Sequence, residues 1–136
     1  MLIDHIAIWT SDIERLKDYY VRFFNGVPNS KYINEKKRFE SYFITFGTGA
    51  RLEIMRREGI PEHINDQEGV HYAGLTHIAF GALTAEEVDK KAEQLTGAGY
   101  PIHSGPRVTG DGYYEFETSD PDGNRVEVSF ETGSGN

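Results

Sequence analysis

The chain has 136 residues, a net charge of −8 at pH 7 and no cysteine. Its length fits one compact domain that can bury a core without cross-links. The missing cysteines exclude disulfides and thiolate metal ligands, and the scattered basic residues argue against nucleic acid as a partner. Neither a secretory signal nor an apolar run of about 18 residues is visible, so we expect a cytoplasmic protein without membrane contact.

The first half of the chain predicts the element order β-α-β-β-β. Residues 4–8 open it with a strand whose side chains alternate between its two faces. Ser11-Asp12-Ile13-Glu14 has the spacing of a helix capping box, and this helix is expected to stop near Gly26. Three strands rich in aromatic and β-branched residues are then expected at about 28–35, 39–47 and 51–56.

The second half repeats that order. Thr76-His77-Ile78-Ala79-Phe80 echoes the first strand, and Thr84-Ala85-Glu86-Glu87 echoes the capping box. The helix is expected to stop at Gly97 or Gly99. Strands are expected at about 101–108, 112–118 and 124–131.

The predicted fold class is therefore α+β, with two βαβββ repeats. A curved, mixed sheet with its helices outside would form a cupped surface. Residues 1–136 make a single domain in this interpretation. Repeat one covers about 1–56, a polar connecting loop about 57–73, and repeat two about 74–131.

Two histidines and two glutamates occupy matched places in these repeats. His5 precedes Glu53 by 48 residues, and His77 precedes Glu127 by 50. On each strand the histidine or glutamate falls on the face opposite the aliphatic side chains, because strand side chains alternate. An unpaired carboxylate in the middle of a strand is costly, and a metal ion would stabilise it.

A structural alternative exists for each of these residues taken singly. His5 could be a half-buried, hydrogen-bonded histidine, and Glu53 could pair with Arg51 or Arg56. All four residues together, matched in repeat, strand and face, favour one divalent metal held by His5, Glu53, His77 and Glu127. These ligand types suit zinc or nickel, and cobalt, manganese and iron(II) remain open.

Other residues are candidates for a substrate pocket. Trp9 and Tyr114 could form an apolar wall, although core packing is an alternative for such aromatic residues. Arg57 and Arg107 could bind an anion, although exposed arginines often have no such role. The remaining histidines, which we expect at the surface rather than as ligands, are His63, His71 and His103.

At these residues the chain resembles the vicinal oxygen chelate superfamily, which contains glyoxalases, bleomycin resistance proteins and extradiol dioxygenases. The resemblance runs from Asp4 to Glu131. It is most specific at His5, at Gly74-Leu75-Thr76-His77-Ile78-Ala79-Phe80 and at Asp120-Pro121-Asp122-Gly123-Asn124-Arg125-Val126-Glu127. The ligand set of two histidines and two glutamates is closest to that of glyoxalase I (lactoylglutathione lyase).

This resemblance implies a metal-dependent lyase or isomerase that acts on a hemithioacetal of a 2-oxoaldehyde, such as methylglyoxal, and a thiol. The implied chemistry is an enediolate proton shuttle, with Glu127 as the shuttling base and Glu53 as a ligand or partner base. The resemblance also implies a homodimer. Trp9 stands where glutathione-using members often have an arginine, so the thiol stays open. The alternatives are an acyl-CoA epimerase of the methylmalonyl-CoA type and a non-catalytic protein that binds a small molecule or antibiotic.

Overall fold

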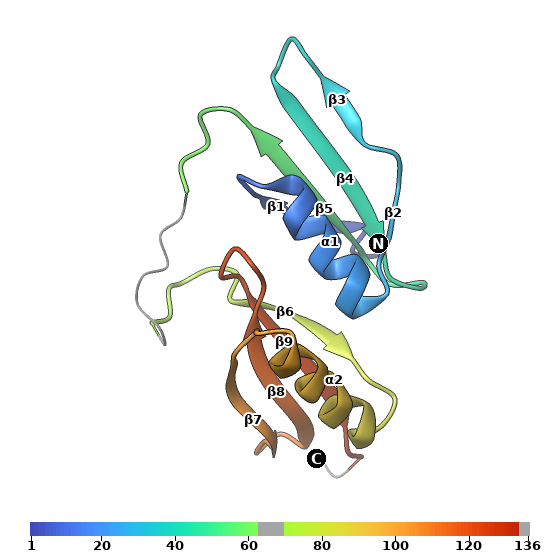
Figure 1. Cartoon of the computed structure of the whole chain (residues 1–136). Coiled ribbons are helices and arrows are strands. Elements are labelled where there is room, and N and C mark those ends of the chain that lie inside the picture. The colour runs from blue at the N-terminus through green and yellow to red at the C-terminus, as the bar shows by residue number, and fades with distance from the viewer. Residues whose placement is uncertain (63–69, 134–136) are drawn as a thin grey trace. The chain divides into compact units, whose positions relative to one another are not determined.

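The computed structural model describes residues 1–62 and 70–133, which belong to two compact units, Met1–Asp66 and Gln67–Asn136. The chain passes from one unit to the other within the predicted connecting loop. Each unit has one helix and one mixed sheet, and the helix lies across one face of its sheet (Figure 1). The predicted α+β class, with two βαβββ repeats, is confirmed.

The first unit has a sheet in the order β1-β5-β4-β2, with β3 also paired to β4. Strands β1 and β5 run parallel, and the other pairs are antiparallel. The single strand predicted at 28–35 is instead two short strands, and both pair with β4. The elements are β1 (His5–Trp9), α1 (Ile13–Phe24), β2 (Val27–Pro28), β3 (Tyr32–Asn34), β4 (Phe39–Thr45) and β5 (Arg51–Arg57).

The second unit has a sheet in the order β6-β9-β8-β7. Strands β6 and β9 run parallel, as β1 and β5 do, and the remaining pairs are antiparallel. The predicted strand positions agree with the structure to within one or two residues. The elements are β6 (His77–Gly81), α2 (Ala85–Gly97), β7 (Ile102–Val108), β8 (Tyr113–Ser119) and β9 (Arg125–Glu131).

The helix ends follow from local hydrogen bonds, and one of them corrects the sequence prediction. Asp12, not Ser11, caps α1, because its carboxylate accepts a bond from the Arg15 amide. Asn25 ends this helix in the left-handed conformation, with φ 54°. A Cβ at the following Gly26 would lie only 2.5 Å from Ile44, so close packing requires glycine there.

The second helix keeps the predicted capping box. The Thr84 hydroxyl accepts a bond from the Glu87 amide, and the Glu87 carboxylate accepts one from the Leu83 amide. The Glu87 side chain therefore reaches one residue further back than in the standard box. Among the described residues, no helix is long and apolar enough to cross a membrane.

Each unit has its own core between the helix and the sheet. In the first unit Leu52 and Ile54 of β5 and Ile44 of β4 are buried on the helix side. In the second unit Val126, Val128 and Phe116 take these positions. Burial of such side chains is the main stabilising term. The opposite face of each sheet is left for the side chains that alternate with them.

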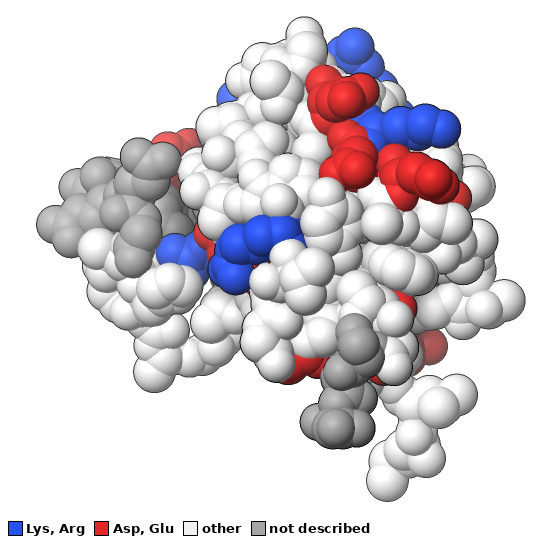
Figure 2. All heavy atoms as spheres, turned by 90° about the horizontal axis from the view of Figure 1, so that it is seen from below, with Lys and Arg blue, Asp and Glu red and all other residues white. Residues whose placement is uncertain are grey.

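Charged side chains are mixed over the surface. On the face shown in Figure 2, basic side chains lie near acidic ones and form no single large basic area. On α1, Lys17 pairs with both Glu14 and Asp18. These ion pairs balance part of the charge on this helix.

Candidate metal centre

In the first unit, His5 and Glu53 come together on the face that the helix does not cover. His5 Nε2 lies 3.5 Å from Glu53 Oε2. His5 Nδ1 is 2.7 Å from an oxygen of Asp4, which also accepts a bond from Arg51. These two hydrogen bonds, from His5 and then Arg51, lower the pKa of Asp4. Asp4 therefore stays ionised and holds the imidazole with Nε2 toward Glu53.

In the second unit, His77 and Glu127 repeat this arrangement. His77 Nε2 lies 3.2 Å from Glu127 Oε2, and His77 Nδ1 lies 2.9 Å from the Thr76 hydroxyl. The exposed fractions match as well. The two histidines have 38% and 37% of their side-chain surface exposed, and the two glutamates 16% and 17%. Both units thus combine an accessible imidazole with a mostly covered carboxylate.

The strand register explains why the two pairs are alike. Glu53 lies opposite Ala7 across the parallel strands β5 and β1, and Glu127 lies opposite Ala79 across β9 and β6. The histidine stands two residues before the alanine in both cases. Because alanine is small, neither pair is covered by a large side chain at that position.

The structural alternative for Glu53 is not observed. Arg51 pairs with Asp4, and Arg56 pairs with Glu40 and donates to the Ser11 carbonyl. Within residues 1–62 and 70–133, the ion-pair partner of Glu53 is His5. A mostly covered carboxylate next to an imidazole, with no arginine partner among the described residues, suits a cation at that position.

Each unit supplies two donors of the proposed set. No three His, Cys, Asp or Glu side chains are close enough to hold a metal ion within the described part of the chain. The donors themselves fit a divalent metal, because both histidines have Nδ1 held by an oxygen and Nε2 turned toward a carboxylate. Metal-binding histidines usually have such an oxygen on their second nitrogen.

The open face of the second unit is acidic beyond Glu127. Glu117 lies opposite Glu127 in the register, and Glu115 lies opposite Ser129. Burial, followed by the charge of Glu127, raises the pKa of Glu115. Three carboxylates on one face repel one another, and a cation placed there would relieve this repulsion.

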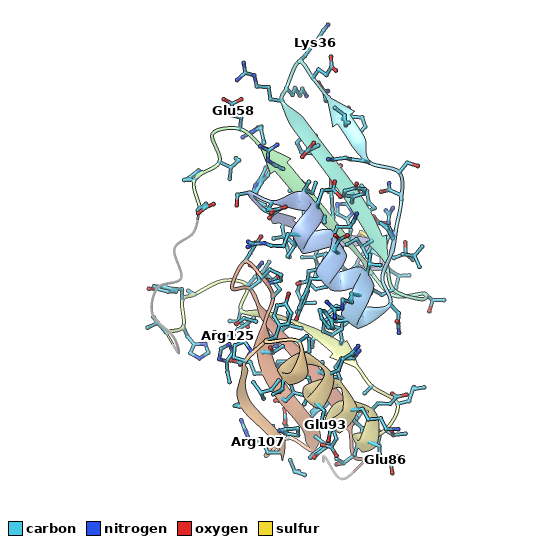
Figure 3. All side chains as sticks on the ribbon, in the orientation of Figure 1. Lys36, Glu58, Glu86, Glu93, Arg107 and Arg125 are labelled. Carbon is cyan, nitrogen blue, oxygen red and sulfur yellow. The ribbon has the colours of Figure 1, made fainter. Side chains whose placement is uncertain are left out.

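Arg125 offsets part of this charge and holds a loop. Its guanidinium lies 3.3 Å from Glu117 and donates to the Val70 carbonyl at 3.1 Å. It also lies 2.8 Å from Nδ1 of His71. Figure 3 shows Arg125 at the start of β9. The segment that leads into β6 is therefore attached to the strand that carries Glu127.

The four candidate pocket residues are not all on the same side of their sheets. Trp9 and Arg57 share the open face of the first sheet, with the Arg57 guanidinium 5.3 Å from the Trp9 ring centre. Arg107 lies opposite Glu115 in the register, on the open face of the second sheet. Tyr114 lies opposite Phe130 and donates to Asp89 of α2, so it is on the helix-covered face. This position agrees with the core-packing alternative for Tyr114 and separates its side chain from the face that carries Glu127.

The remaining histidines have other surroundings. His71 contacts Arg125, and His103 Nε2 lies 2.8 Å from the Ser119 hydroxyl. His63 lies outside the described residues. The sequence prediction did not assign roles to Asp4 and Thr76, although both directly precede a candidate ligand histidine, and this repeated position was the available signal.

Comparisons with known proteins agree with this architecture. Residues 2–128 match the sequence model of the Glyoxalase/Bleomycin resistance protein/Dioxygenase superfamily. The chain is 40% identical over 133 residues to the uncharacterized protein YqjT of Bacillus subtilis (strain 168), covering 91% of this chain and 94% of YqjT. The chain therefore belongs to the glyoxalase, bleomycin resistance protein and dioxygenase superfamily.

Solved structures show the same fold at lower identity. The trypanothione-dependent glyoxalase I of Leishmania major has a TM-score of 0.76 and 19% identity, covering 98% of this chain and 88% of that one. A lactoylglutathione lyase from Agrobacterium tumefaciens has a TM-score of 0.69 and 20% identity, covering 98% and 96%. A glyoxalase family protein from Enterococcus faecalis has a TM-score of 0.71 and 25% identity, covering 93% and 95%.

Proposed function

We propose that the chain is a metal-dependent lyase or isomerase of the glyoxalase I type. One divalent metal, with zinc or nickel as the first candidates, would be held by His5, Glu53, His77 and Glu127. The observation that carries the proposal is the repeated pair geometry, in which each unit turns one histidine Nε2 toward one mostly covered glutamate. A duplication that had kept only structural residues would not need to keep this orientation.

The substrate class proposed is the hemithioacetal of a 2-oxoaldehyde, such as methylglyoxal, with a low-molecular-weight thiol. When bound, the metal would polarise two neighbouring substrate oxygens and make the adjacent C–H more acidic. Glu127 would take the proton from one carbon and return it to the next, giving a 2-hydroxyacyl thioester. Glu53 would act as a ligand or as a partner base.

The surroundings of Glu127 support this division of roles. The acidic groups Glu115 and Glu117 lie on the same face as Glu127, which is the face that the helix does not cover. Asp4 and Thr76 would act as positioning residues, because they hold the histidines rather than touch the substrate.

We also propose that the protein works as a homodimer in a cytoplasmic setting. Strands β1 and β6 are the terminal strands of their sheets, and such strands offer unpaired backbone groups for association. Sedimentation velocity across a concentration series would test this, and a mass of one chain at all concentrations would contradict it.

Two other functions remain candidates. An acyl-CoA epimerase of the methylmalonyl-CoA type would use the same proton transfer on a 2-substituted acyl thioester. A protein that binds a small molecule or antibiotic without turnover would fit the superfamily as well. The set of two histidines and two glutamates favours the two enzyme hypotheses over the non-catalytic binding protein.

A substrate panel tests the proposal. The metal-loaded protein is incubated with methylglyoxal and several low-molecular-weight thiols, and formation of a 2-hydroxyacyl thioester is followed. A parallel assay follows exchange of the C2 hydrogen of methylmalonyl-CoA with deuterated solvent. Thioester formation supports the lyase, exchange in the second assay alone favours the epimerase, and no turnover in either favours the binding protein.

A further inference from the structure

The first sheet has a cavity of about 250 Å³ beside the turn that joins β3 to β4. In the register, Ile33 lies opposite Glu40, and Glu40 lies opposite Arg56, so the three side chains share a face. Arg56 comes two residues after the buried Ile54, which places this row on the helix side of the sheet. We call this space the turn cavity, and its lining includes Ile33, Glu35, Arg38, Glu40, Arg56 and Glu58.

The turn cavity is on the opposite face of the sheet from the candidate metal ligands of this unit. On β5, Glu53 alternates with Leu52 and Ile54 and lies on the open face, whereas Arg56 is on the helix side. A ligand in the turn cavity would therefore not touch the surface that carries His5 and Glu53. The turn cavity is a separate place from the site of the proposed function.

Hydrogen bonds within the turn fix one wall of the turn cavity. The Asn34 side-chain oxygen accepts a bond from the Lys37 amide at 3.1 Å. The Glu35 carbonyl accepts a bond from the Arg38 amide at 3.2 Å. Because the turn is already ordered, a ligand would bind there at little further cost in conformational freedom.

Arg56 has terminal nitrogens that a carboxylate can reach. Its Nε donates to the Ser11 carbonyl at 3.2 Å, which holds the guanidinium in place. Its Nη1 is 3.5 Å from Glu40, longer than an ordinary hydrogen bond of about 2.9 Å. Glu40 has a closer partner in Lys31, at 3.1 Å. A ligand carboxylate could therefore bind Arg56 without leaving Glu40 unpaired.

Two acids beside the turn can accept from an ammonium group. No Lys, Arg or His nitrogen lies within ion-pair distance of Glu35 in the described part of the chain. Glu58 pairs with Arg38, and both side chains are mostly exposed (Figure 3 labels Glu58). Exposed ion pairs contribute little to stability, so Glu58 can exchange its partner for a ligand cation at small cost.

The charges around the turn cavity nearly cancel. Three glutamates and two arginines line it, and Lys31 offsets one of the glutamates from outside the lining. A near-neutral space with separate acidic and basic groups suits a ligand that carries one charge of each sign. An uncharged apolar ligand would instead cover these charged groups without replacing their contacts with water.

We infer that the turn cavity binds a small zwitterion, namely an α-amino acid with an apolar side chain. Its carboxylate would accept hydrogen bonds from Arg56, and its ammonium group would donate to Glu35, with Glu58 as a second acceptor. Its side chain would lie against Ile33, which is 59% exposed. Pockets for drug-sized ligands have about 300–1,000 Å³, so this smaller volume suits a molecule of amino-acid size.

The test is a titration of the full, metal-free chain, followed through its amide NMR signals. L-leucine is compared with 4-methylpentanoate, which lacks the ammonium group, and with 3-methylbutylamine, which lacks the carboxylate. We expect saturable shifts with L-leucine at residues 33–40 and 56–58. Both analogues should bind at least about tenfold more weakly, because each loses one set of charge-assisted hydrogen bonds.

Three variants complete the test. Arg56→Gln should bind L-leucine no more tightly than wild type binds 3-methylbutylamine. Glu35→Gln should weaken L-leucine at least about fivefold, and it decides the question if Arg56→Gln fails to fold after losing its bond to Ser11. The control, Lys36→Gln, removes a charge from the same turn outside the lining and should bind as wild type does (Figure 3).

Three results would overturn the inference. L-leucine could bind wild type no more tightly than its two analogues, or its shifts could fall only outside residues 33–40 and 56–58. Glu35→Gln and Arg56→Gln could also bind like Lys36→Gln. The titration needs neither metal nor turnover, so its outcome is independent of the proposed function.

Discussion

The Nε2 atom of His77 lies 3.2 Å from Oε2 of Glu127, and the equivalent atoms of His5 and Glu53 are 3.5 Å apart. These contacts sit at the same register in the two sheets, beside Ala79 and Ala7. The duplicated sequence has thus kept a donor pair and the space next to it.

Glu127→Gln should lower turnover of the hemithioacetal substrate at least about 100-fold, because glutamine cannot carry the proton. The isosteric amide should leave the fold and melting temperature close to those of wild type. The matched control is Glu131→Gln, a substitution at the exposed end of the same strand, which should keep full activity. Unchanged turnover in Glu127→Gln would refute the shuttle role.

Removing the oxygen that holds Nδ1 of each candidate ligand histidine should weaken metal binding. Asp4→Ala and Thr76→Ala should each lower metal affinity about 10- to 100-fold, since the imidazole loses the partner that orients it. Asp4→Asn should recover much of the loss, because an amide oxygen still accepts from Nδ1. Affinity is measured by competition with a chelating dye, and wild-type values for both alanine variants would contradict the positioning role.

Tyr114→Phe should leave metal binding and turnover unchanged. The Tyr114 hydroxyl donates to Asp89 of α2, so its loss affects the helix contact and not the open face. A small decrease in melting temperature is expected. Kinetics on the best thiol substrate provide the measurement, and a large change in KM or kcat would place Tyr114 back in the pocket.

The ionised side chain of Glu14 should stabilise the fold at neutral pH, and this effect should be lost in acid. Hydrogen bonds from Lys17, then Lys31, lower its pKa from 4.5 to about 2. Because the folded pKa is the lower one, this stabilisation is complete above about pH 4.5 and is lost as pH falls toward 2. Since Glu14 is half exposed, Glu14→Gln should cost only about 0.5–1 kcal/mol at pH 7. Urea unfolding of wild type and Glu14→Gln at pH 7 and at pH 2 tests this. A difference in the free energy of unfolding that is as large at pH 2 as at pH 7 would argue against it.

The sequence predicted the strands and the sheet faces of the candidate ligands well, for a physical reason. Alternation along a strand determines which side chains share a face, and Leu52 and Ile54 proved buried where Glu53 is on the open side. The division of 28–35 into two strands was not predictable from composition, because both segments have strand-like residues. What separates them is pairing with different parts of β4.

The side-chain partners were harder to predict than the faces. Arg51 and Arg56 were equal candidates to pair with Glu53. In the structure, Arg51 pairs with Asp4 and Arg56 pairs with Glu40. Which acid an arginine pairs with depends on the distances between side chains on neighbouring strands, and these distances cannot be read from sequence spacing. The two alternatives for Tyr114, a pocket wall or core packing, stayed open because aromatic character indicates burial but not the side of the sheet.

We propose that the two histidine–glutamate pairs form one metal site. The direct test is the metal content of purified protein, before and after chelation and reloading, for wild type, His5→Ala and His77→Ala. The proposed site predicts one divalent ion per chain in wild type and near-complete loss in either variant. No metal under any loading condition would contradict the site, and retention of full metal by either variant would contradict the shared ligand set.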